Sequence, residues 1–245
     1  MESNNDRAVI GGKMQQHYEK VWQSGDAWSL ESSEYERHKY DYQYTLLNAR
    51  RYGRVLEIGC GSGCFTRRLA AISDFVVAVD IAAAAIERAK LQVSTGEARG
   101  FIDFRVTSIM DYDVLSEGPW DLVVFSETIY CLGWLYPMFD VAYLAANLRE
   151  ATKLGGRLLL TNTYGQAKDW LLRPWLIDTY RDLFRNVGYS LEKEEIFCSN
   201  KEGVDVSVLM SLFCAPSCSP SSAPYVLWTV ENTGFNPKGT KALNL

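Results

Sequence analysis

The sequence places a glycine-rich loop between an apolar run and a helical pattern. Residues 57–63 read EIGCGSG, and Asp80 stands at the end of the next apolar run, 17 residues after Gly63. Glycines in such a loop let the backbone turn tightly and let a ligand approach the main chain. A carboxylate at the end of the following strand commonly accepts hydrogen bonds from ribose hydroxyls. This pattern predicts a site for a ribose-bearing cofactor; the alternative is a tight turn followed by a helix-capping aspartate.

The order of residues in the loop favours a cofactor with an amino-acid end. A dinucleotide site has G-x-G-x-x-G and needs its third glycine for packing of helix on strand, whereas this loop reads G-x-G-x-G with Cys64 at the sixth place. Glu57, two residues before the first glycine, would repel a pyrophosphate and attract an ammonium group. No Gly-Lys-Ser/Thr follows, so the loop is not a P-loop. These features argue against NAD.

Three further residues are candidates for chemistry on the substrate. Glu127 follows an apolar run and Tyr130 lies about one helical turn later, so a carboxylate there could take a proton from an amine or orient it. The alternative for Glu127 is an acid at a helix start that complements the helix dipole. His38 would suit general-base chemistry on a hydroxyl acceptor; the alternative is a solvated histidine in a charged helix.

An alternation of strands and helices must position these residues. The patterns predict strands at 54–58, 75–79, 101–106, 121–125 and 157–163, and helices at 64–72, 82–93, 135–153 and 175–186. Gly155-Gly156 would close the third of these helices. Strands at 190–198 and 204–213 read as an antiparallel hairpin. The fold class is therefore α/β: a Rossmann-like, seven-stranded mixed sheet, parallel with one antiparallel strand, and helices on both faces.

Composition excludes several function classes. The 245 residues carry 25 Lys and Arg against 30 Asp and Glu, a net charge of −5, which argues against a dedicated nucleic-acid partner. No apolar run approaches the 18 residues of a membrane span, and the N-terminus lacks a signal-peptide pattern. The six cysteines show no zinc-type pairing. We expect a cytoplasmic protein with mostly reduced thiols, no metal site and no membrane partner.

Several motifs together carry a family resemblance. Residues 57–63 resemble motif I of the class I S-adenosylmethionine (SAM) methyltransferases, and Asp80 resembles their ribose-binding acid. WDLVVFSETIYCL (120–132) is similar to their fourth-strand motif, and KLGGRLLLTNTYG (153–165) to their fifth-strand motif. Upstream, DAWSLESSEYERHKYDYQYTLL (26–47) resembles the nodulation-protein-S (NodS-like) branch, whose members N-methylate an amino group on a sugar.

The resemblance implies SAM as cofactor and assigns roles by position. Glu57 would approach the methionine amino group, and Asp80 would hold the ribose hydroxyls. Ser108 stands where the family usually has an aspartate, so the usual carboxylate contact to the adenine amine is not implied here. The residues expected at the cofactor are Trp28, Arg37, Glu57, Gly59, Cys60, Gly61, Asp80, Ile81, Ser108, Ile109 and Ser126.

Three parts are expected along the chain. Residues 1–45 would form a helical lid over the cofactor, although their aromatic side chains could equally form the apolar face of an ordinary docking helix. Residues 46–214 would form the methyltransferase domain, and 215–245 a Pro/Ser linker and tail. The segment 225–230, YVLWTV, is strongly β-prone. It would dock on this chain or on a second subunit of a homodimer; the alternative is an unstructured tail.

The function expected from these observations is methyl transfer from SAM to a small-molecule acceptor at an amino group, with an aminosugar-like acceptor implied by the resemblance. Two alternatives stay open. One is O-methylation of a hydroxylated natural product, which would favour His38 over Glu127 as the base. The other is a protein of the same fold that binds SAM without catalysis.

Overall fold

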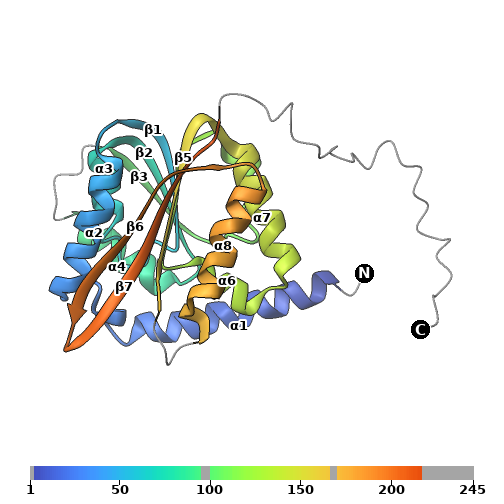
Figure 1. Cartoon of the computed structure of the whole chain (residues 1–245). Coiled ribbons are helices and arrows are strands. Elements are labelled where there is room, and N and C mark those ends of the chain that lie inside the picture. Colours follow the sequence, from blue (N-terminus) through green and yellow to red (C-terminus); the bar gives the residue numbers. More distant parts are fainter. Residues whose placement is uncertain (1–2, 95–99, 166–169, 217–245) are drawn as a thin grey trace, which may run out of the picture.

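A seven-stranded sheet forms the centre of the computed structural model, which describes residues 3–94, 100–165 and 170–216 (Figure 1). The strand order is β3-β2-β1-β4-β5-β7-β6, and β7 runs antiparallel to both β5 and β6. The predicted mixed sheet is confirmed. Its strands are β1 (Tyr52–Ile58), β2 (Ser73–Asp80), β3 (Phe101–Val106), β4 (Trp120–Ser126), β5 (Thr152–Thr163), β6 (Ser190–Lys201) and β7 (Val204–Cys214).

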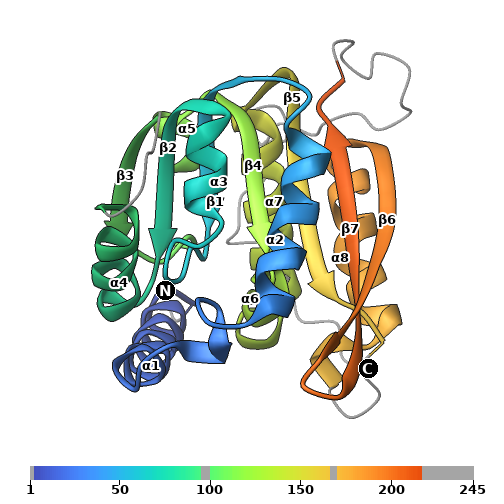
Figure 2. The ribbon, with the colours of Figure 1, turned by 90° about the vertical axis from the view of Figure 1, so that its left-hand side faces the viewer.

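Alternate residues of the central strands point into two separate cores. In β1, Leu56 and Ile58 join the core on one face, while Val55 joins the core on the other. This period of two follows from strand geometry, and burial on both faces explains why these strands read as continuous apolar runs. Figure 2 shows α3 (Thr66–Ala71) and α4 (Ala83–Ser94) on one face, with α7 (Met138–Ala151) and α8 (Pro174–Asn186) on the other.

The N-terminal segment is helical and lies close to the carboxyl ends of the parallel strands. It consists of α1 (Ser3–Gln23), a 3-10 turn η1 (Ala27–Ser29) and α2 (Glu34–Leu47). α1 crosses below the ends of β1 and β2, whereas α2 packs along the same face as α3 (Figures 1 and 2). The segment therefore covers the edge of the sheet where an α/β fold binds its ligand.

The long helix predicted at 135–153 is wrong at both ends. The structure has two helices, α6 (Ile129–Leu135) and α7, which Pro137 separates, because proline fixes its φ and favours a helix start. Gly155 and Gly156 do not close a helix but belong to β5, which begins at Thr152 instead of Arg157. A Cβ on Gly156 would lie 3.1 Å from the Trp120 carbonyl oxygen, where the register between β4 and β5 shifts. The glycine allows two backbones to approach at an irregularity in the sheet.

The β-prone segment 225–230 lies outside the described residues, and so does most of the linker before it. Over residues 3–94, 100–165 and 170–216, no helix is long and apolar enough to cross a membrane. The short helix α5 (Val114–Glu117) and the turn η2 (Trp170–Leu172) were not predicted, because each is much shorter than the stretch of about 11–18 residues over which helical periodicity is detected.

Candidate active site

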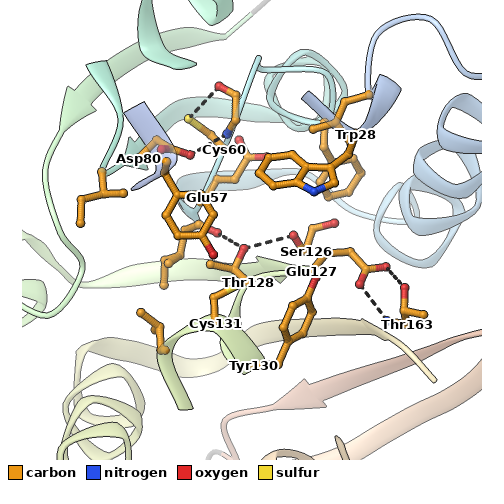
Figure 3. A pocket seen from close by; sticks show the side chains of 18 of the residues that line it. Trp28, Glu57, Cys60, Asp80, Ser126, Glu127, Thr128, Tyr130, Cys131 and Thr163 are labelled. Carbon is orange, nitrogen blue, oxygen red and sulfur yellow. Dashed lines mark hydrogen bonds between the residues drawn. The ribbon is translucent and has the colours of Figure 1, made fainter. Parts of the chain in front are cut away.

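A cavity of about 500 Å³ opens at the carboxyl ends of β1, β2 and β4. The glycine loop, the N-terminal helices and the segment from Ser126 to Leu132 surround it (Figure 3). The cavity brings together twelve of the fourteen predicted site residues: Trp28, Glu57, Gly59, Cys60, Gly61, Asp80, Ile81, Ser108, Ile109, Ser126, Glu127 and Tyr130.

The glycine loop approaches its neighbours too closely for side chains. Gly59 and Gly61 have φ angles of 73° and 53°, a region that favours glycine. A Cβ on Gly59 would lie 2.5 Å from Thr128 Oγ1, and one on Gly61 would lie 2.9 Å from the Trp22 ring. The loop therefore needs glycine for its backbone and for the packing of the N-terminal helix against it.

Asp80 ends β2 with its carboxylate held by two backbone amides. The Gly61 amide donates to Oδ2 at 2.9 Å, and the Ala82 amide donates to Oδ1 at 2.9 Å. Burial nevertheless raises the pKa of Asp80 above its ordinary value, against these hydrogen bonds. Each carboxylate oxygen has a second lone pair, so Asp80 can also accept hydrogen bonds from two vicinal hydroxyls.

Glu57 is a buried acid at the floor of the cavity, between Asp80 and Glu127 in Figure 3. The Thr66 hydroxyl donates to Oε2 at 2.5 Å. Burial raises the pKa of Glu57 to about 8, and the nearby Asp80 carboxylate adds to this effect. A buried cation would favour the ionised form, so the site suits an ammonium group of the ligand.

Aromatic residues of the N-terminal segment cover the glycine loop. Trp22 is buried and its ring centroid lies 5.7 Å from that of Trp28, which in turn lies 6.2 Å from that of Tyr18. Trp28 and Ser29 both have positive φ angles, 56° and 60°. Such angles are strained for residues other than glycine, and Asp26 holds this turn by accepting from the amides of residues 31 and 32.

Glu127 stands at the opposite side of the cavity from Asp80, directly after β4 (Figure 3). It too has a positive φ, 61°, and its amide donates to the Thr161 carbonyl oxygen. The Thr163 amide donates to Oε2 at 2.8 Å, and the Thr163 hydroxyl donates to Oε1 at 3.1 Å. The residue is therefore more than a helix-start acid, because β5 fixes the direction of its carboxylate.

Helix α2 contributes charged residues to the cavity that the sequence reasoning missed. Glu36 and Lys39 are both buried and paired at 2.7 Å, and Lys39 Nζ lies 3.5 Å from Glu127 Oε1. Lys201 of β6 also lines the cavity and pairs with Glu36 at 2.7 Å. The signal that could have found them is helical periodicity, because Glu36, Lys39 and Tyr40 share one face of α2.

Two predicted residues do not line the cavity. Arg37 and His38 lie on the outer side of α2, with side chains 59% and 53% exposed, and both approach Glu34. Their place follows from the helix: burying Glu36 and Lys39 turns the two positions between them towards solvent. The expected roles of Arg37 at the cofactor and of His38 as a base have no support in this geometry.

The cavity fits the cofactor that the sequence motifs imply. Asp80 offers paired acceptors for a diol, Glu57 offers a buried acid for an ammonium group, and Gly59 and Gly61 line the cavity with backbone alone. In the described part of the chain no three His, Cys, Asp or Glu side chains are grouped so that they could hold a metal ion.

The sequence profile of the nodulation protein S (NodS) family matches residues 12–175 of this chain. Nodulation protein S of Rhizobium tropici is 26% identical over 179 residues, which are 71% of this chain and 70% of that protein. The protein of the same name from Bradyrhizobium diazoefficiens is 29% identical over 155 residues, 61% of this chain and 66% of its own. Ubiquinone biosynthesis O-methyltransferase of Thiobacillus denitrificans is 27% identical over 119 residues, 49% of this chain and 48% of its own.

Solved structures show the same fold. The crystal structure of N-methyltransferase NodS from Bradyrhizobium japonicum WM9 in complex with S-adenosyl-L-homocysteine (SAH) superposes with a TM-score of 0.65 at 20% identity. The match covers 81% of this chain and 96% of that one. Magnesium protoporphyrin IX methyltransferase from Synechocystis PCC 6803 with bound SAM gives a TM-score of 0.53 at 17% identity, covering 72% and 78%.

We predict that Asp80→Ala weakens SAH binding by about 10- to 100-fold, because a charged acceptor of hydroxyl bonds contributes about 1.5–3 kcal/mol. Calorimetric titration of the folded variant measures this loss. Asp74→Ala is the matched control, since Asp74 lies on the same strand but is exposed and pairs with Arg51. Unchanged SAH affinity in folded Asp80→Ala would contradict the role of this acid.

We also predict that SAH binding near pH 7 releases a proton from Glu57. With a pKa of about 8 the acid is mostly protonated before binding, whereas an ammonium partner stabilises the ionised form. Affinity should therefore rise as the pH increases from 6 towards 8. Calorimetry in buffers of different ionisation enthalpy measures the proton, and Glu57→Gln should release none. Proton release that persists in Glu57→Gln would assign it to another group.

Proposed function

This chain belongs to the NodS family of SAM-dependent methyltransferases, and from that premise we propose that it methylates an amino nitrogen of a small, aminosugar-like acceptor. The observation that carries the proposal is Glu127, a fixed carboxylate on the far side of the cavity from Glu57 and Asp80. The cofactor groups would lie along Asp80 and Glu57. The acceptor nitrogen would then approach the space between Glu57 and Glu127.

The cofactor, when bound, supplies an electrophilic methyl group on a sulfonium. That methyl group would pass to the lone pair of the acceptor nitrogen, and the cofactor's sulfur would leave with the bonding electrons as a neutral thioether. The chain's task is to hold the two partners in line, and such positioning can account for roughly 7–11 kcal/mol of the barrier. An amine must also lose a proton to be nucleophilic, and Glu127 is placed to accept a hydrogen bond from it.

The positions of Glu127 and His38 favour nitrogen over oxygen as the atom that is methylated. The O-methyl alternative would use His38 as the base, but this side chain points away from the cavity. An ionised carboxylate is a hydrogen-bond acceptor only, which suits the N–H group of an amine. Tyr130, on α6, lines the same side of the cavity and would contact the acceptor.

The experiment that tests the proposal is a methyl-transfer screen with SAM over aminosugars, simple amines and phenols, with the mass and methylation site of each product determined. Methylation of an aminosugar nitrogen is the expected result. A phenol product would favour the O-methyl alternative. Binding of SAH without turnover on any acceptor class would favour a protein that binds the cofactor without catalysis.

We predict that Glu127→Gln lowers kcat by about 100-fold or more, the lower end of the range for a positioned acid or base, while SAH affinity stays unchanged. His38→Ala serves as the control and should have little effect on kcat. The reverse pattern, in which His38→Ala lowers kcat and Glu127→Gln does not, would contradict the role of Glu127 and favour methylation of a hydroxyl group.

The N-terminal helices act as a lid in this proposal. Trp22 packs over Gly61, and side-chain contacts attach the segment to α4: Glu31 pairs with Arg88 at 2.7 Å and accepts from Gln92 at 2.7 Å, and Glu19 accepts from the Ala84 amide. A segment held to its neighbour by side-chain contacts of this kind can open for the cofactor to enter.

Hydrogen exchange with and without SAH measures this closure. We predict that SAH slows amide exchange in residues 14–45, because a ligand in the cavity that these residues help to line stabilises the closed position. The hairpin of β6 and β7 provides an internal reference. Equal amide exchange of residues 14–45 with and without SAH would show that these helices stay packed on the domain and do not act as a lid.

A further inference from the structure

Four charged side chains form a chain of ion pairs at the acceptor side of the cavity. Lys39 Nζ lies 2.7 Å from Glu36 Oε2 and 3.5 Å from Glu127 Oε1, and Lys201 Nζ lies 2.7 Å from Glu36 Oε1. Lys201 also donates to the Trp28 carbonyl oxygen at 3.1 Å. The chain of pairs thus joins α2, the strained turn of η1, the hairpin and the segment after β4.

Stability alone does not account for these charges. Glu36 and Lys39 are each only 3% exposed, and a buried ion pair often contributes no more to stability than apolar residues of similar volume. Apolar side chains at these positions would continue the core that Tyr35, Tyr40 and Leu47 of the same helix already join. Lys39 lies at the edge of that core, 3.5 Å from Glu127. We therefore expect this lysine to act at the site.

The contacts of Glu127 define that role. A carboxylate accepts about four hydrogen bonds, and three donors of the described residues contact this one: the amide and hydroxyl of Thr163, and the ammonium of Lys39. Lys39 and the Thr163 hydroxyl both approach Oε1, which leaves one acceptor position on Oε2. Rotation about the last side-chain torsion of glutamate is broad, so Lys39, together with the two Thr163 donors, decides where that position points.

We propose that Lys39 is a positioning residue, which turns the Glu127 carboxylate so that its remaining acceptor position faces the nitrogen of the acceptor. This inference rests on the proposed function of Glu127. Because Lys39 belongs to α2, the lid completes the catalytic group that follows β4. Glu36 and Lys201 hold Lys39 in place from the other side.

The surroundings keep the ammonium of Lys39 charged. Burial by itself would lower the pKa of Lys39, but the carboxylates of Glu127 and Glu36 more than offset this, and the pKa lies above its ordinary value. The rings of Tyr35 and Tyr40 lie 5.7 and 5.2 Å from the ammonium and add cation–π attraction. The group thus stays a donor to Glu127 at neutral pH.

A double-mutant cycle on the full chain tests the proposal, with glucosamine or the best amine of the acceptor screen as substrate. Lys39→Met, Glu127→Gln and the double variant are compared in kcat, in acceptor KM and in SAH affinity. If Lys39 acts through Glu127, Lys39→Met lowers kcat by about tenfold or more with SAH affinity unchanged, and the double variant is no slower than Glu127→Gln. Lys39→Arg, which keeps the donor, should recover most of kcat. Lys193→Met is the control, because Lys193 is an exposed residue of β6 that pairs with Glu195.

Losses that multiply in the double variant would overturn the proposal, because they would show that Lys39 acts independently of Glu127. A wild-type kcat in Lys39→Met would overturn it as well. If Lys39→Met does not fold, the cycle is run with Lys39→Gln, which keeps a donor for Glu36 without the charge. Failure of the proposed function has a different signature: Glu127→Gln would then be as active as the wild type.

Discussion

Four carboxylates line one cavity: Glu36, which pairs with Lys39 and Lys201, and three others, around whose negative charge the rest of the site is organised. Like charges at short distance oppose one another's ionisation, and burial raises the cost further. Each acid meets this constraint differently. Asp80 accepts hydrogen bonds from two backbone amides. Glu57 accepts one from the Thr66 hydroxyl, and the pKa of Glu57 is raised to about 8. Glu127 accepts hydrogen bonds from Thr163 and pairs with the Lys39 ammonium. Glu57, which the described residues provide with no cation, is the acid suited to a cation brought by the ligand.

The same constraint explains why the N-terminal helices belong to the site. Among the described residues, the ammonium groups that reach the cavity lining come from α2 and from the end of β6. The sheet alone supplies acids and hydroxyls at the ends of β1, β2, β4 and β5. The cover therefore contributes charge as well as shape, and Trp22 packs closely over Gly61. In the proposed lid, closure would complete the site electrostatically.

Local sequence signals predicted the cofactor side of the site and most of the sheet. The glycine loop, Asp80 and the apolar runs each depend on short-range chemistry, so their roles could be stated before the fold was known. Of the three lid residues chosen from the sequence, Trp28 lines the cavity, whereas Arg37 and His38 lie on the outer side of their helix. Periodicity groups Glu36, Lys39 and Tyr40 on one face of this helix, but only the burial of that face in the fold shows that it turns inward.

The errors in the second half of the sheet have a related cause. Gly155 and Gly156 look like a helix end, because glycine is common there, yet they lie in β5, where Gly155 has a positive φ of 72° and both glycines hydrogen-bond to the chain after β7. Ala215 donates to the Gly156 carbonyl oxygen and accepts from the Gly155 amide. These are contacts between segments about 60 residues apart, which no local pattern in the sequence contains. The buried pair of Lys39 and Glu127 is of the same kind, joining residues 88 positions apart. Chemistry that depends on long-range pairs of this sort is visible only once the sheet has brought its strand ends to one edge.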